Sequence, residues 1–405
     1  MLLEDREFIM EDYFVDTNLV NTQPMKRAAY SDRTAWIMAE ISRLVYERLP
    51  VEIKVTNVID EIKNAIEQGK YEDVLEGLVS RLQKDGVKIE SKVIDVLSKA
   101  NFELVDSYSV DGTEAVVAKL ESHPGFPGML VLAFRGTQKS LDDIRTDANA
   151  GLVDAPQGGR VHCGFLKAFQ EIENQIKQTL SEHPDLPIYI TGHSLGGALA
   201  MLATRYLSPN NLGATYTFGC PRVANNEFFR DVRTPVYRVV NAADGVARLP
   251  FGDGFTLALS AIRLIPINGT KVISEWLRKR FGEYTHFGNL VFLSAPDNVI
   301  DDNGIEFRDL AVIKSPNIFW RARVVANRMI ASRGKAAFND HGIENYTRKL
   351  LAYAKRRNVE IMSATIVGDV ALKQDEFVSE ILTKKSTKKT KAVSKKTKKA
   401  ELVKD

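Results

Sequence analysis

Short apolar runs and helix-like patterns alternate along most of this chain. Runs rich in β-branched and aromatic residues predict buried strands, and apolar residues three or four positions apart predict helices. Strands are expected at 102–108, 114–120, 129–134, 187–191, 214–218, 235–241 and 287–293, and helices at 164–182, 196–207, 224–231 and 343–356. Because helices alternate with the later strands, the pattern predicts an α/β fold with a mostly parallel central sheet flanked by helices.

The segment ahead of these strands has a helical pattern. Thr34–Tyr46 places Ile37, Ile41 and Leu44 on one face, which indicates an amphipathic helix. Further helices are expected near 56–68, 71–84 and 90–99. We therefore divide the chain into a polar, loosely packed N-terminal arm at 1–30, a helical lead-in at 31–100, a main domain at 101–360, an extension at 361–383 and a Lys-rich tail at 384–405.

One glycine-rich turn carries the strongest chemical signal. The strand expected at 187–191 runs into Gly192-His193-Ser194-Leu195-Gly196, and an Ala/Leu-rich helical pattern follows. A strand, a sharp turn and a helix form the elbow in which G-x-S-x-G presents a nucleophilic serine. Gly192 and Gly196 leave room for this strained turn, since a Cβ atom at either position would crowd it. Ser194 is therefore the candidate nucleophile.

A nucleophilic serine needs a base, and two histidines compete for that role. With this elbow the partners follow in the order serine, acid, histidine, so the base must lie after residue 194. His286 lies at the entry to an expected strand, whereas His341 lies in a loop just ahead of the helix expected at 343–356. A loop before a late helix suits a base that projects towards the nucleophile, so we favour His341 and keep His286 as the alternative.

The acid and the oxyanion donors are expected at the ends of strands. Asp244 directly follows the strand at 235–241, and the carboxyl ends of strands line the ligand crevice of open α/β sheets. Asp253 lies further from the strand end and is the weaker candidate. The oxyanion of an acyl-transfer intermediate needs two donors. One is expected from the N–H of Leu195, directly after the nucleophile, and the other from the loop Arg135–Thr137 that follows the strand at 129–134, where Gly136 allows close approach and Thr137 offers an N–H and a hydroxyl.

Several segments, in this order, resemble class 3 lipases, the fungal-lipase-like group of α/β hydrolases. The resemblance runs from about Thr34 to Lys355 and is strongest in Ala133–Thr137, Val161–Phe165, Thr191–Gly197, Thr217–Arg222, Arg238–Pro250, Tyr284–Gly288 and Asp340–His341. It implies an α/β-hydrolase fold with Ser194 as nucleophile, Asp244 as orienting acid and His341 as base. It also implies an oxyanion hole formed by Thr137 and Leu195, and a lid from Ser140 to about Leu152.

The chain departs from that family in three places. The lid segment holds three aspartates and no aromatic residue, Ala247 replaces the usual proline of the acid loop, and the span from Asp244 to His341 is long. That span includes an apolar insertion at 255–266 and a segment at 318–333 that mixes apolar residues with four arginines. The second insertion is either a surface helix packed on the core or a basic helix that lies on an anionic membrane surface.

Composition sets broad limits on the protein. The chain has 405 residues, 44% hydrophobic and 26% charged, which is enough for a large core. Two cysteines, Cys163 and Cys220, do not make a disulfide framework, although one bridge stays open. The N-terminus carries acids where a signal peptide is basic and then apolar, and no run approaches 18 apolar residues. A cytoplasmic location is the default expectation, with export that needs no cleaved signal as the alternative.

The tail has a different composition from the rest of the chain. Residues 384–405 hold ten lysines and two acids, whereas the whole chain has a net charge of only +3. Such a block is expected to be disordered and to attract polyanions, anionic membrane surfaces among them. It has no aromatic residue to stack on bases, so nucleic-acid reading is not expected.

These residues predict a serine carboxylic-ester hydrolase, with a triacylglycerol-type lipase as the preferred form. It would cleave glycerolipid esters through an acyl-enzyme, and neither a cofactor nor a metal ion is implied. Phospholipase A1, a short-chain esterase or an acyltransferase with the same triad is the nearest alternative. A non-catalytic lipid- or polyanion-binding protein on a hydrolase scaffold is the alternative from another class.

Overall fold

The computed structural model describes residues 12–21, 29–47, 49, 92–122, 126–136, 151–207, 213–249, 283–301 and 304–359. Several expected features lie outside this part of the chain, namely the helices near 56–68 and 71–84, Thr137, most of the lid segment, Asp253, the insertion at 255–266 and the tail at 384–405. The chain divides into two compact units, Met1–Tyr353 and Ala354–Asp405. The sheet and the candidate site belong to the first unit.

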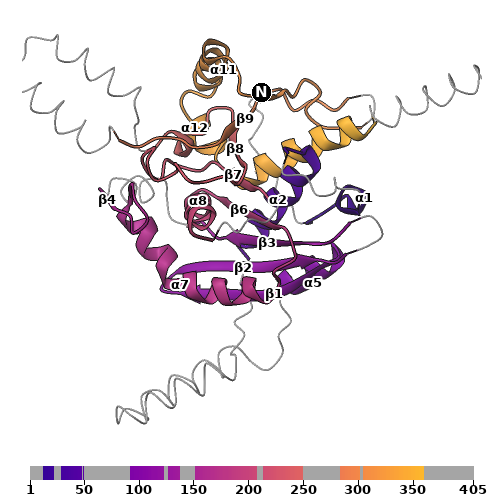
Figure 1. The fold of residues 1–405 in the computed structure, drawn as a ribbon. Coiled ribbons are helices and arrows are strands. Elements are labelled where there is room, and N and C mark those ends of the chain that lie inside the picture. Colours follow the sequence, from indigo (N-terminus) through magenta and orange to yellow (C-terminus); the bar gives the residue numbers. More distant parts are fainter. Residues whose placement is uncertain are drawn as a thin grey trace, which may run out of the picture. The chain divides into compact units, whose positions relative to one another are not determined.

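Within the described residues, the first unit is built around an eight-stranded sheet with the order β1-β2-β3-β6-β7-β8-β9-β10 (Figure 1). Its strands are β1 (Phe102–Val110), β2 (Thr113–Leu120), β3 (Met129–Phe134), β6 (Ile188–His193), β7 (Thr215–Phe218), β8 (Val236–Asn241), β9 (Asn289–Leu293) and β10 (Val312–Lys314). From β3 to β9 the neighbours are parallel, whereas β1, β2 and β10 pair antiparallel. The predicted α/β fold with a mostly parallel central sheet is therefore confirmed.

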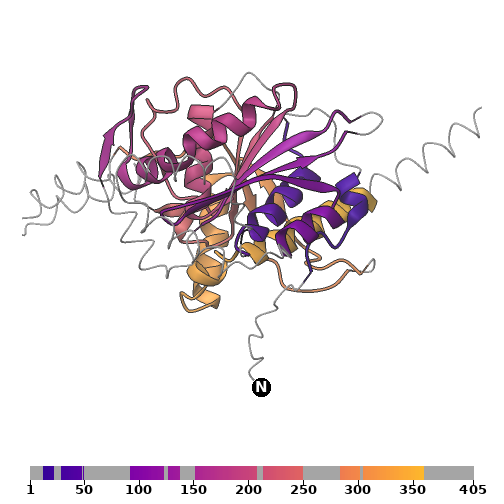
Figure 2. The same ribbon diagram turned by 90° about the horizontal axis from the view of Figure 1, so that it is seen from below.

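Helices cover both faces of the sheet (Figure 2). On one face, α7 (Cys163–Ser181) and α8 (Leu195–Leu207) pack on Ile188 and Ile190 of β6. On the other face, α2 (Asp32–Leu44) packs on β6, and Ser42 Oγ lies 2.9 Å from Thr191 Oγ1. Side chains of successive strand residues point to opposite faces, so a strand covered on both sides is buried at every position. This explains the continuous apolar run in β3 and the full burial of β6.

The N-terminal segment packs more closely than its sequence indicates. Residues 12–21 were expected to form a loosely packed arm, but Phe14, Leu19 and Val20 are buried and Thr17–Asn21 forms helix α1. The Phe14 ring stacks on Phe102 and meets the edge of Trp36. The segment covers the outer side of α2, and this is why α2 is buried from Thr34 to Leu44 and not on one face alone.

The helix expected at 224–231 does not form. Residues 226–231 make turns, and Ala224 bridges to both Val161 and Thr285. The Asn225 side chain accepts hydrogen bonds from the backbone N–H groups of Arg160 and Phe228 at 3.0 Å. These side-chain hydrogen bonds compete with the backbone hydrogen bonds of a helix. The spacing of apolar residues in the segment gives no information about them.

The remaining elements are short or lie near the C-terminus. The helix expected at 90–99 is α5 (Lys92–Lys99), and the arginine-rich segment forms α11 (Ile318–Ala331). A helix over 343–359 corresponds to the one expected at 343–356. The pair β4 (Leu152–Asp154) and β5 (Arg160–His162), the strand β10 and the helix α12 (Ala336–Asn339) were not expected, since three or four residues are too few to show periodicity. Both cysteines are free thiols.

Replacement of Phe14 tests the packing of the N-terminal segment. Phe14→Ala removes a buried ring and should lower the free energy of unfolding by about 3 kcal/mol. Val15→Ala, at a neighbouring position that is 49% exposed, should change it by less than about 0.5 kcal/mol. Urea denaturation of both variants measures the difference. Equal stabilities would mean that the segment does not pack on the domain.

Candidate active site

Four parallel strands end at one edge of the sheet and bring distant loops together. Phe134 at the end of β3 pairs with Gly192 of β6, and the Ser194 N–H donates to the carbonyl of Phe218 at the end of β7 at 2.9 Å. The Gly219 N–H donates to Val239 of β8 at 3.1 Å. The carboxyl ends of parallel strands share one edge, so the serine turn, Gly219 and the loop after β8 become neighbours.

Ser194 occupies a strained turn between β6 and α8. Its φ is +57°, in the left-handed region that side chains other than glycine rarely adopt, and it is 1% exposed. A Cβ atom on Gly192 would overlap the carbonyl of Gly196, and one on Gly196 would overlap the carbonyl of Phe134. Neither position accepts a side chain. Leu195 is the first residue of α8, so its N–H belongs to the first turn, which lacks intrahelical acceptors.

The structure brings Ser194, His341 and Asp244 into one hydrogen-bonded row. His341 Nε2 lies 3.0 Å from Ser194 Oγ, and Nδ1 lies 3.1 and 3.0 Å from the two Asp244 carboxylate oxygens. An ionised carboxylate only accepts, so the proton of neutral His341 is on Nδ1 and the Nε2 lone pair faces the serine hydroxyl. All three residues are buried. This arrangement can transfer a proton from the hydroxyl to the imidazole while the acid holds the tautomer.

His286, the alternative base, lies in different surroundings. It lines a cavity with Arg222, Arg238 and Arg321. Burial, followed by the positive charges of Arg238 and Arg222, holds the pKa of His286 well below its usual value.

Asp244 is surrounded by donors from its own loop and from a distant helix. Oδ1 accepts from the N–H groups of Val246 at 2.9 Å and Ala247 at 3.4 Å, and the Tyr346 hydroxyl donates to Oδ2. Tyr346 in turn accepts from the Asn241 N–H at 3.0 Å. Burial and the Asp244 charge raise the pKa of Tyr346 well above its usual value, so it remains a donor. Tyr346 had no distinguishing signal in the sequence.

A second histidine positions the backbone of His341. His193 Nε2 lies 2.7 Å from the His341 carbonyl oxygen, which can only accept, so Nε2 carries the proton. Nδ1 then accepts from the Tyr46 hydroxyl at 2.9 Å. Burial and the neighbouring His341 hold the pKa of His193 well below its usual value, which keeps the ring neutral. The Tyr46 oxygen also accepts from the Gly136 N–H, in the loop after β3.

Gly219 lies directly against the acid and the base. Its φ is +58°, and a Cβ atom there would lie 2.6 Å from Asp244 Oδ2 and 2.9 Å from His341 Nδ1. Only glycine can therefore fill this position without displacing the pair. Sequence reasoning did not assign Gly219 a role, although a glycine directly after an expected strand, within one of the family-like segments, was the available signal.

A network of polar groups holds the His341 loop against the acid loop. The Asp340 carboxylate accepts from the Ala243 N–H at 3.0 Å and pairs with Arg328 of α11 at 3.0 Å. The Asn241 amide donates to the Asp340 carbonyl at 2.9 Å and accepts from Lys349 Nζ at 2.7 Å. Lys349 also donates to the Ser294 carbonyl at 2.8 Å. The spacing between base and acid is therefore fixed from several sides.

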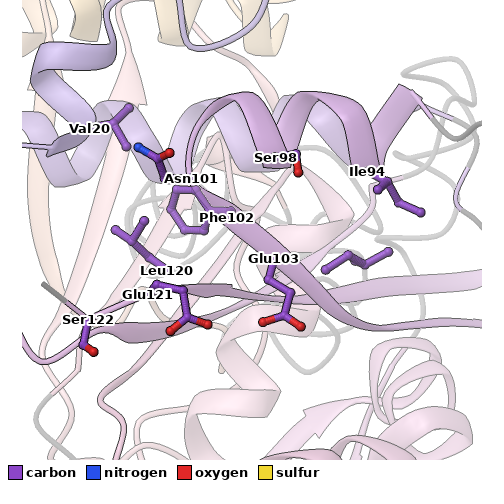
Figure 3. Close-up of a pocket in the computed structure, with 10 residues that line it drawn as sticks. Val20, Ile94, Ser98, Asn101, Phe102, Glu103, Leu120, Glu121 and Ser122 are labelled. Atoms are coloured by element: carbon purple, nitrogen blue, oxygen red, sulfur yellow. The ribbon is translucent and has the colours of Figure 1, made fainter.

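A cavity of about 760 Å³ lies away from this row. It opens between α5 and the β1–β2 edge, and its lining includes Phe102, Leu120, Glu103 and Glu121 (Figure 3). No member of the Ser194–His341–Asp244 row lines it.

The described residues contain neither a cluster of potential metal ligands nor a long apolar helix. No group of three or more histidine, cysteine, aspartate or glutamate residues there could hold a metal ion, and no helix there is long and apolar enough to cross a bilayer.

Comparison with known proteins identifies one family. Residues 131–254 match the family model described as Lipase (class 3). Triacylglycerol lipase OBL1 of Arabidopsis thaliana is 30% identical over 234 residues, which cover 44% of this chain and 45% of that protein. Secreted mono- and diacylglycerol lipase 1 of Fusarium solani is 35% identical over 152 residues, which cover 35% of this chain and 45% of that protein. The resemblance expected from the motifs is confirmed.

The match to these relatives is partial. The chain spans about half the length of the curated relatives it matches. A solved structure, the mono- and diacylglycerol lipase of Aspergillus oryzae, is 22% identical, with a TM-score of 0.46 over 77% of this chain and 96% of that one. The Fusarium protein is named as secreted, which is in tension with the cytoplasmic location expected from the N-terminal sequence.

The buried amine of Lys349 predicts a pH dependence of stability. Burial lowers its pKa from 10.5 to about 8. Between these pH values the unfolded chain binds more protons than the folded one, so the free energy of unfolding should rise with pH. The rise across this window should be about 3 kcal/mol. Lys349→Met should lack it, and urea denaturation of both proteins at pH 8 and pH 10.5 gives the comparison. If the free energy of unfolding changed with pH in the same way for both proteins, the lowered pKa of Lys349 would be contradicted.

Proposed function

We propose that this chain, whose residues 131–254 match the class 3 lipase family model, is a class 3 lipase and a serine hydrolase that cleaves carboxylic esters of glycerolipids. One observation carries the proposal: Ser194 Oγ lies 3.0 Å from His341 Nε2, while His341 Nδ1 faces the buried Asp244 carboxylate. A hydroxyl, an imidazole and a carboxylate in this order form the arrangement that activates a serine nucleophile.

The proposed reaction proceeds in two halves. Ser194 Oγ attacks the ester carbonyl carbon while His341 Nε2 takes the hydroxyl proton, and Asp244 stabilises the resulting imidazolium. The tetrahedral intermediate collapses when His341 returns this proton to the departing alcohol oxygen, which leaves an acyl group on Ser194. Water then attacks the acyl carbon with His341 again as base. The bond between the acyl carbon and Ser194 Oγ breaks as His341 returns the proton to Oγ, and the carboxylic acid product departs.

Backbone donors are proposed to stabilise the oxyanion. The Leu195 N–H, at the start of α8, is one donor. The second is assigned to Thr137, which lies outside the described residues. The adjacent Gly136 N–H is bound to the Tyr46 hydroxyl, so Tyr46 anchors the start of the loop that carries Thr137.

The names of the relatives support glycerolipids as the substrate class. One is named for triacylglycerol and another for mono- and diacylglycerol. The intact row of serine, histidine and acid favours catalysis over a non-catalytic lipid-binding scaffold. We also propose that the Lys-rich tail at 384–405 contacts anionic membrane surfaces. The tail lies outside the described residues.

The helical lead-in is proposed to be an integral part of the catalytic domain. The α2 helix packs on β6, and Tyr46 just beyond its end binds His193, whose other nitrogen holds the His341 backbone. Removal of the lead-in would therefore disturb the base as well as the core.

Replacement of the nucleophile is the direct test. Ser194→Ala should lower the turnover of a p-nitrophenyl ester by about 10⁴-fold or more and abolish labelling by a fluorophosphonate probe, because the proposed acyl-enzyme forms on Ser194. A folded Ser194→Ala protein with wild-type turnover would refute the mechanism. A series of emulsified triacylglycerols, phospholipids and soluble short-chain esters then separates a lipase from a phospholipase A1 or an esterase.

Replacement of Tyr46 tests how the base is positioned. Tyr46→Phe leaves His193 Nδ1 without its donor and should lower kcat about tenfold with KM little changed, because the His341 backbone loses part of its support. Tyr13→Phe is the matched control, since its hydroxyl binds Glu47 and contacts no residue of the site. Equal kcat values for the two variants would mean that Tyr46 does not help to position His341.

A further inference from the structure

Helix α11 lies at the periphery of the first unit, beyond β8 and β9 (Figure 1). One side of the helix packs on the domain. The Trp320 ring meets the edge of Phe292 with 5.8 Å between centroids, and Val324 packs against the same apolar cluster. Yet none of the 14 residues of α11 is buried, in contrast to α2. A large part of the α11 surface is therefore turned towards solvent.

The solvent-exposed face of α11 carries large apolar side chains. Phe319 and Ile330 are 81% and 77% exposed. They are eleven positions apart, which is close to three helical turns, so both lie on one face. Ile318 beside them and Phe338 of the adjoining helix α12 are also exposed. Four of the nine exposed large apolar side chains in the described part of the chain thus lie in these two helices. Apolar side chains gathered in this way indicate an interaction surface.

The same face is positively charged. Arg323 is exposed and lies four positions after Phe319 and seven before Ile330, so it shares their face. The stem of an arginine can lie along an apolar surface while its guanidinium reaches charged groups. The segment 315–339 contains four arginines, one lysine and no acidic residue. Two of these basic side chains are exposed in the turn that leads to α12, namely Arg333 and Lys335.

We propose that the exposed face of α11, together with Phe338 of α12, docks the protein on an anionic lipid surface. The apolar side chains would enter the boundary between headgroups and acyl chains, and the cations would lie beside lipid phosphates. A second copy of the chain fits this face less well, because a two-fold contact would place its arginines against the same arginines. The docking face goes beyond the proposed ester hydrolysis, and it is separate from the Lys-rich tail.

The docking face is attached to the loops of the candidate active site. Helix α12 is followed directly by Asp340 and the base His341. The Ala337 carbonyl of α12 accepts from the Gly245 N–H of the acid loop at 3.0 Å. Arg328 of α11 pairs with Asp340 at 3.0 Å. A lipid surface bound by α11 and α12 would therefore lie next to the segment that carries the base.

Vesicle binding by the full-length protein with Ser194→Ala tests the docking without lipid hydrolysis. Partition into vesicles of phosphatidylcholine and phosphatidylglycerol is measured by sedimentation. Phe319→Ser and Ile330→Ser should each weaken partition by about tenfold, because each removes an apolar side chain from the lipid. Ile300→Ser is the matched control and should leave partition unchanged, since Ile300 is 64% exposed but lies between Asp297 and Asp301.

Replacement of Arg323 tests the role of charge. Arg323→Gln should weaken partition by about fivefold, and Arg323→Lys should keep it, because lysine retains the charge. Arg233→Gln, at an exposed position just before β8, is the control and should have no effect. The Lys-rich tail is present in every variant, so these differences report on α11. Equal effects of Arg323→Gln and Arg233→Gln, or of Phe319→Ser and Ile300→Ser, would overturn the proposal.

An added tryptophan reports the contact directly. The extra emission of Phe319→Trp should be quenched by lipids with brominated acyl chains, whereas that of Ile300→Trp should not. Binding through the tail alone would leave both unquenched and overturn the proposal. Sedimentation velocity without lipid detects the other occupant, since a dimer that Phe319→Ser dissociates would make this face a contact between two copies. Because Ser194 is replaced throughout, these outcomes do not depend on whether the protein hydrolyses esters.

Discussion

The Asp244 carboxylate is fully buried, and an unpaired charge in that position would be strongly destabilising. Its oxygens are bound by the His341 ring, the Tyr346 hydroxyl and the N–H groups that follow Asp244 in its own loop. Gly219 closes the remaining side without a side chain. Burial of this carboxylate therefore requires three segments to lie together: the loop after β8, the loop before the helix at 343–359 and the turn after β7. Their contacts with Asp244 fix the orientation of the His341 ring.

The parallel sheet and the N-terminal helix supply the rest of that geometry. Strands β3, β6, β7 and β8 end at one edge, so the serine turn and the acid loop are neighbours although many residues separate them. On the opposite face of the sheet, the chain leaves the end of α2 and reaches Tyr46, and the hydrogen bonds from Tyr46 through His193 reach the His341 carbonyl. The core helix and the base are thus parts of one hydrogen-bonded unit.

The two faces of strand β8 lie in different surroundings. Asn241 and Arg238 are an odd number of residues apart, so their side chains point to different sides of the sheet. Asn241 binds Lys349 and the Asp340 carbonyl beside the row of Ser194, His341 and Asp244, whereas Arg238 lines the cavity that His286 also lines. The acid loop also belongs to both, because Asp244 orients the base and Ala247 and Arg248 line the cavity.

Local signals in the sequence determined every described strand longer than three residues, most of the described helices and the strained serine turn, because periodicity and glycine spacing act over a few neighbouring residues. They also sufficed to select Ser194, Asp244 and His341 as the candidate row. Tyr46, Gly219 and Tyr346 became recognisable only in the folded chain, since their partners lie far away in sequence and the strand order that joins them is not written in any local pattern. The failed helix at 224–231 has the same origin: long-range bridges from Ala224 and the bonds of the Asn225 side chain outweighed local apolar spacing.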